Sequence, residues 1–116
     1  MALIVIMVTA SPFQSARWRT AVSLAAAAIE RGHRAALFLF MDGVYGALRR
    51  RRGSDSAVLP SGRLASLVRS GVRVCLCGTA AELRGLDSAA FVEGITVGGL
   101  PDLALMIEEA DHLVSL

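Results

Sequence analysis

Residues 72–79 read Val-Arg-Val-Cys-Leu-Cys-Gly-Thr, an apolar run that ends in two cysteines and a glycine. A run of this length is typical of a strand buried on both faces, and residues 79–83 favour a short helix. A strand followed by a tight turn and a helix is the repeating unit of a parallel α/β sheet. The stretch also puts the Cys77 thiol at a helix start, where free amides and the helix dipole favour a thiolate.

The same alternation of strand and helix continues through the rest of the chain. Four other apolar segments predict strands, at residues 3–8, 35–40, 95–97 and 112–116. Helical spacing predicts a first helix that begins at Ser11 or Ser15 and ends at Gly32, a second closed by Gly71, and a third over residues 101–110. No repeat or long linker divides the chain. We therefore predict one domain, residues 1–116, a three-layer α/β/α fold around a mainly parallel five-stranded sheet.

Cysteine usage points to a reducing compartment. On an extended strand the Cα atoms of Cys75 and Cys77 lie about 6.6 Å apart, near the upper limit for a disulfide, so pairing them would distort the strand. The apolar residues 2–8 lack a basic region before them and are much shorter than a membrane helix. We expect a cytoplasmic protein with a buried first strand and neither a signal peptide nor a membrane anchor.

Charge and hydropathy indicate whether the chain binds nucleic acid or other protein subunits. The net charge is only +2, and four of the basic residues form the run from Arg49 to Arg52, with no interleaved aromatic residue. A solvated loop is therefore favoured over contact with RNA or an acidic partner, and direct nucleic-acid binding is not expected. The hydrophobic content of 54% and the mean hydropathy of +0.57 are high for a small monomer. We expect an oligomer with apolar interfaces.

Ligands and chemistry in a parallel sheet belong at the carboxyl ends of the strands. Those ends carry residues 9–11, 41–45, 77–79 and 98–99, so Cys77 lies on this edge. His33 and His112 precede strands and are expected on the opposite edge, as surface or interface residues. Helix capping and turn formation account for Asp42 and Asp102 more simply than acid–base catalysis does.

Several kinds of site are excluded by their missing motifs. The chain has no Gly-x-Gly-x-x-Gly sequence, Walker A sequence or serine hydrolase elbow. Cys75 and Cys77 lack the second ligand pair that a structural zinc requires, so we expect no metal. Spacing alone leaves a nucleophilic Cys77 and two small core cysteines as equal interpretations.

Four segments of the chain form a recognisable pattern. They are Val8-Thr9 with the helix ending at residues 30–33; residues 37–40 with Asp42-Gly43-Val44-Tyr45-Gly46-Ala47; Cys77 followed by Arg84-Gly85; and residues 93–100 with 110–114. In this order they resemble the DsrE/TusD-like sulfur relay proteins. The resemblance covers nearly the full chain and implies a DsrEFH-like fold.

The resemblance implies a cytoplasmic sulfur carrier or sulfurtransferase that accepts sulfane sulfur as a persulfide on Cys77. It passes the sulfur to a partner protein in tRNA 2-thiolation or in sulfur oxidation, and no cofactor is needed. The implied partners are sulfur donor and acceptor proteins and further copies or related DsrE-family subunits in an oligomer. We expect the Gly78 and Thr79 amides to hold the anionic sulfur, and Tyr45 to line the pocket or to pack. Cys75 has no counterpart in the TusD pattern; a structural role is favoured over a resolving one.

Two rival interpretations stay open. The chain is a noncatalytic assembly subunit or small-ligand-binding module on the same fold if Cys77 is buried and inert. A redox enzyme that uses both cysteines is disfavoured by the strained Cys-x-Cys span.

Overall fold

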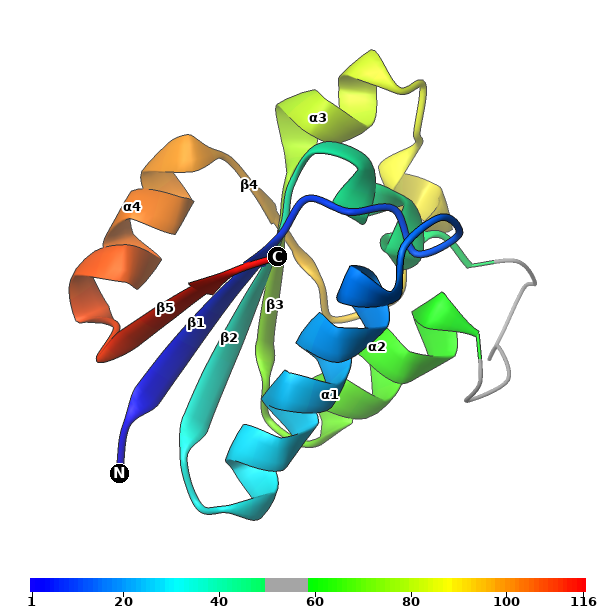
Figure 1. Ribbon diagram of the computed structural model, residues 1–116. Coiled ribbons are helices and arrows are strands. Elements are labelled where there is room, and N and C mark those ends of the chain that lie inside the picture. The colour runs from blue at the N-terminus through cyan, green and yellow to red at the C-terminus, as the bar shows by residue number, and fades with distance from the viewer. Residues whose placement is uncertain (50–58) are drawn as a thin grey trace.

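A single parallel sheet organises the computed structural model, which describes residues 1–49 and 59–116. Its strands lie in the order β4-β3-β2-β1-β5, and every neighbouring pair is parallel. Helices α1 and α2 cover one face and α4 covers the other (Figure 1). The predicted three-layer α/β/α fold is confirmed. The strands are β1 (Leu3–Val8), β2 (Arg34–Leu39), β3 (Arg73–Cys77), β4 (Thr96–Gly98) and β5 (His112–Ser115), and the covering helices are α1 (Ala16–Glu30), α2 (Pro60–Arg69) and α4 (Leu100–Glu109).

Backbone hydrogen bonds, more than the polarity of side chains, decide where the helices and strands begin. Helix α1 begins at the later of the two predicted positions, because the Ser15 Oγ accepts the Arg17 amide at 3.2 Å. Strands β2 and β3 both begin at an arginine that pairs with its neighbouring strand, Arg34 with Leu3 and Arg73 with Ala36. Apolar patterning predicts that these strands begin at residues 35 and 72, one residue too late for β2 and one too early for β3.

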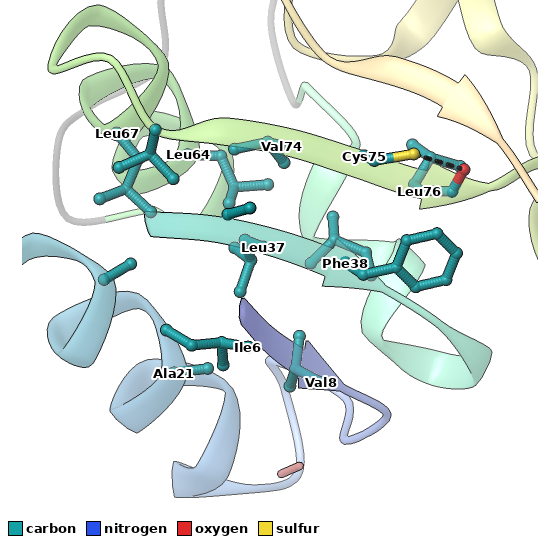
Figure 2. Close-up of a cluster of buried hydrophobic side chains, with 14 of the residues drawn as sticks. Ile6, Val8, Ala21, Leu37, Phe38, Leu64, Leu67, Val74, Cys75 and Leu76 are labelled. Carbon is teal, nitrogen blue, oxygen red and sulfur yellow. Dashed lines mark hydrogen bonds between the residues drawn. The ribbon is translucent and has the colours of Figure 1, made fainter. Parts of the chain in front are cut away.

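The core lies mainly between the central strands and the two helices α1 and α2. Ile6, Leu37 and Val74 stand side by side on β1, β2 and β3, and each is almost fully buried. Figure 2 shows Val74 close to Leu64 and Leu67 of α2, and Ile6 close to Ala21 of α1. Phe38 and Cys75 pair with each other and alternate to the face that α4 covers. Burial on both faces explains why β1, β2 and β3 read as continuous apolar runs.

A 3₁₀ helix, η1 (Met41–Ala47), follows β2 where the sequence suggested only a turn or loop. Two glycines allow it to pack closely, since a Cβ at Gly43 would collide with the Val8 carbonyl oxygen and one at Gly46 with the Trp18 ring. The buried Trp18 Nε1 donates to the Gly43 carbonyl oxygen at 3.2 Å. The segment is thus a fixed part of the sheet's carboxyl edge.

The remaining described segments are short. Helix α3 (Gly78–Leu83) follows β3, and a 3₁₀ turn, η2 (Ser88–Ala90), precedes β4. Of the predicted arginine loop, Arg49 is described, and its Nη2 donates to the Ala89 carbonyl oxygen at 2.9 Å; residues 50–52 lie outside the described residues. Across residues 1–49 and 59–116, no helix combines the length and apolar character needed to cross a bilayer.

Candidate functional site

Cys77 stands at the junction of β3 and α3, on the carboxyl edge of the sheet. It is the last residue of β3, it pairs with Gly98 of β4, and it is also the residue that caps α3. Figure 1 shows α3 rising beyond the ends of the central strands. A parallel α/β sheet collects its ligand-binding groups at this edge.

The cap on α3 is made by sulfur. The Cys77 Sγ accepts the backbone N–H of Ala80 at 3.4 Å, the geometry in which Ser or Asp usually caps a helix. The amides of Gly78 and Thr79 belong to the first turn, where no preceding helical carbonyl is available to accept them. Cys77 itself is only 4% exposed. The sulfur is therefore buried beside backbone donors that favour negative charge.

Helix η1 forms the adjoining wall of this region, since it packs against α3. It carries Tyr45, which is half-buried, and Asp42, which forms an ion pair with Arg84 at the end of α3. Gly78 and Thr79 follow Cys77 directly, and the fold brings the segment that bears Tyr45 against the helix that these residues begin.

Cys75 occupies a different environment, two residues before Cys77 on the same strand and further into the core. Its side chain is fully buried, and its thiol points toward the Leu76 carbonyl oxygen at 4.0 Å, as Figure 2 shows. Burial raises the pKa of the Cys75 thiol; the Asp102 and Cys77 charges add to the rise, and Arg73 opposes it. Cys75 is therefore protonated at neutral pH and poorly suited to attack a sulfur donor.

This burial predicts an alkaline loss of stability. The unfolded chain releases the Cys75 proton near the ordinary value of 9.0, whereas the folded chain retains it to higher pH. Stability is then full below pH 9.0 and falls as the pH rises from 9.0 through the raised pKa of the folded state. Cys75→Ala removes this contribution, so the free energy of unfolding of the variant should fall less steeply above pH 9 than that of the wild type, in urea titrations from pH 8 to 10. Equal slopes in the two proteins would contradict the assignment.

The two histidines and Asp102 lie where their predicted roles require. His33 immediately precedes β2 and accepts the Ala2 amide through Nδ1 at 3.0 Å, and His112 opens β5, so both lie at the amino edge. The Asp102 carboxylate accepts the Gly99 amide at 2.8 Å and caps α4, as predicted. Within the described part of the chain, no three His, Cys, Asp or Glu side chains gather as metal ligands.

The sequence analysis missed three members of this region. It assigned no role to Ala80, whose amide contacts the sulfur, or to the Arg84 side chain, and it gave Asp42 only a capping or turn role. Asp42 and Arg84 are 42 residues apart, and a pairing over that separation leaves no local pattern in one sequence. The sulfur cap had one signal in the sequence, a cysteine three residues before Ala80 at the start of a predicted helix.

One family model, several solved structures and two curated relatives resemble this chain. The profile of the DsrE/DsrF-like family matches residues 2–116. The crystal structure of the ychN protein from E. coli superposes with a TM-score of 0.88 at 28% identity, covering 100% of both chains. MTH1491 of Methanobacterium thermoautotrophicum, a protein of unknown function, superposes over 100% of both chains with a TM-score of 0.80 at 18% identity, which supports the fold alone. The uncharacterised protein MK0008 of Methanopyrus kandleri is 26% identical over 114 residues, 97% of this chain and 92% of that one. The chain belongs to the DsrE/DsrF-like family.

Proposed function

We propose that this protein carries sulfane sulfur as a persulfide on Cys77. The Cys77 thiolate attacks the terminal sulfur of a donor persulfide, so that one S–S bond forms as the donor's S–S bond breaks and the donor leaves as a thiolate. An acceptor thiolate then attacks the terminal sulfur on Cys77 and releases the Cys77 thiolate. The two steps are one exchange run in opposite directions, so no electrons are gained or lost overall and no cofactor takes part.

The observation that carries the proposal is the sulfur cap of α3. Among the described residues, a thiolate at Cys77 receives the Ala80 N–H, and the amides of Gly78 and Thr79 are free of helical partners. A terminal persulfide sulfur that extends from Cys77 is also anionic, and it would take these two amides as donors. Tyr45 lines the approach from η1 in this scheme.

Family membership supports the setting of the reaction. We infer protein donors and acceptors in a reducing cytoplasm, where free thiols persist, in a pathway of tRNA 2-thiolation or sulfur oxidation. The two free cysteines of the described chain are compatible with that compartment.

Onward transfer is the experiment that tests the carrier function. Purified protein is loaded with inorganic polysulfide, freed of small molecules on a desalting column, and then mixed with an excess of a thiol acceptor. The carrier function predicts release of about one sulfane sulfur for each chain and return of the protein to its original mass. A load that the acceptor thiol fails to remove would contradict it.

Burial of Cys77 favours one alternative function. With 4% of its surface exposed, the thiol is less accessible than those of most reactive cysteines. A noncatalytic subunit or ligand-binding module on the same fold would keep Cys77 as a core residue and as the cap of α3. This function predicts no sulfur load on folded protein, together with unchanged assembly when Cys77 is replaced by Ser.

We propose in addition that the chain assembles into an oligomer, with copies of itself or with related subunits. Exposed apolar side chains lie on α4 and on the strand that follows it, and a monomer would leave them in water. They are Leu100, Leu105, Ile107 and Leu113.

Light scattering on a sizing column tests this assembly. The purified chain should elute with a mass that is a multiple of one chain, because the apolar side chains on α4 favour association. Leu105→Glu should shift the mass toward the monomer, whereas Leu83→Glu, at a more exposed position on α3, should leave it unchanged. A wild-type chain that is monomeric at micromolar concentration would contradict self-association.

A further inference from the structure

A continuous series of contacts joins Asp42 to the Cys77 sulfur. The Asp42 Oδ1 accepts the Arg84 Nε at 3.0 Å and lies 2.9 Å from its Nη2. The third guanidinium nitrogen, Nη1, donates to the Ala80 carbonyl oxygen at 3.0 Å. Ala80 is the residue whose amide donates to the Cys77 Sγ at 3.4 Å. Ala80 thus accepts from Arg84, which Asp42 binds, through its carbonyl oxygen, and donates to the Cys77 sulfur through its amide.

The Asp42 end of the series is fixed in place. Helix η1 is held on the sheet by the close approach of Gly43 to Val8 and by the Trp18 hydrogen bond to the Gly43 carbonyl oxygen. Asp42 directly precedes Gly43, so its carboxylate extends from a rigid part of the edge. The carboxylate is half-exposed, at 53%, whereas the Arg84 side chain is only 21% exposed.

The α3 end needs such support. This helix has only six residues, and a helix of that length is not stable without tertiary contacts. In its last turn the Ala81 and Glu82 carbonyl oxygens accept backbone amides from the residues that follow the helix, and the Arg84 guanidinium donates to the Ala80 carbonyl oxygen. In residues 1–49 and 59–116 the Asp42–Arg84 contact is the sole ion pair between side chains. This ion pair therefore lies at the end of the helix that Cys77 caps.

We propose that Asp42 and Arg84 are positioning residues for the sulfur chemistry of Cys77. The inference rests on the proposed carrier function and names the residues that hold the Cys77 sulfur in position for attack. The pair holds Ala80 so that its amide points at the sulfur, and it thereby keeps the Cys77 sulfur in place for nucleophilic attack. Neither residue exchanges a bond with the substrate.

The variant Asp42→Asn separates positioning from simple charge. Loss of a nearby negative charge, by itself, stabilises a thiolate and speeds its reactions. Loss of the ion pair instead frees Arg84 and loosens the Ala80 amide, which slows them. The two effects have opposite signs, so the direction of the change identifies the mechanism.

The experiment measures iodoacetamide alkylation of Cys77 between pH 6 and pH 9 in a Cys75→Ser background, by intact mass. Asp42→Asn should react about fivefold more slowly at pH 7, the loss expected for one hydrogen bond. Asp42→Glu keeps the carboxylate and should restore most of the rate. The matched control is Glu82→Gln, which removes the same charge from an exposed position of α3 and should not slow the reaction. An Asp42→Asn rate equal to or above that of its parent would overturn the proposal.

Hydrogen exchange supplies a readout that needs no sulfur chemistry. The Ala80 amide should exchange several-fold faster in Asp42→Asn than in its parent, while amides of the central strand β2 keep their rates. If the wild type takes up no sulfur yet this difference is seen, the carrier function fails and the positioning of Ala80 stands. If the wild type loads sulfur and Ala80 exchanges at equal rates in both proteins, the carrier function stands and the positioning role fails.

Discussion

Cys77→Ser reduces sulfur loading to background, whereas Cys75→Ser loads nearly as well as the wild type. This is the largest functional effect that we expect. Cys77 lies at the carboxyl edge with a backbone donor on its sulfur, while Cys75 is fully buried with a raised thiol pKa. The thiolate is the attacking species, so Cys77 should take up nearly all of the sulfur and Cys75 nearly none. Loading is measured by intact mass after incubation with inorganic polysulfide and removal of excess reagent without reductant.

Each serine variant is the matched control of the other. Both remove one thiol from the same strand, two residues apart, and replace it with a hydroxyl of similar size. Treatment with dithiothreitol should remove the added sulfur from the wild type and from Cys75→Ser. Equal loss of loading in the two variants would undo the assignment of Cys77 and would favour a reaction that uses both cysteines.

Gly43→Ala should lower the free energy of unfolding by about 3 kcal/mol, the largest stability effect that we expect from a single added methyl group. The new Cβ would meet the Val8 carbonyl oxygen, which belongs to the backbone of a central strand and cannot rotate away. Either η1 or β1 has to move, and movement of η1 would also stretch the Trp18 hydrogen bond. Urea denaturation followed by circular dichroism measures the loss.

Gly99→Ala is the control for the Gly43 variant. Its Cβ would make only an ordinary contact with Pro101, at 3.6 Å, so the expected loss is the modest one of about 1 kcal/mol for alanine at a helix cap. If the two variants are destabilised equally, the close approach of η1 to β1 does not limit stability.

Much of the fold could be predicted from the sequence because it is encoded locally. Strands buried on both faces produce apolar runs such as residues 3–8, which match β1 at both ends. Prolines and caps mark the helix starts, and Gly32 and Gly71 take the positive φ angles of 82° and 95° beyond the first two helices. The family resemblance rested on these same segments, and its expectation of a parallel α/β sheet is confirmed.

The parts that could not be predicted depend on contacts between distant segments. Helix η1 forms because Gly43 and Gly46 fit under Val8 and Trp18, and a single sequence shows only glycines that suggest a turn. The Asp42–Arg84 pair joins η1 to the end of α3 at the carboxyl edge. The burial of Cys77 was open as well, since spacing places a thiol at a helix start without showing what covers it.

The measurement that tests the central claim most directly is the position of the added sulfur in the wild-type protein. Trypsin cuts after Arg73 and Arg84, so both cysteines fall in the peptide of residues 74–84, and fragmentation between them assigns the sulfur to one. The protein is loaded with polysulfide, alkylated to protect the persulfide, and digested. We predict that the extra sulfur is found on Cys77 and that Cys75 carries none. An extra sulfur on Cys75, or an unloaded peptide from folded protein, would contradict the assignment of this chain as a persulfide carrier.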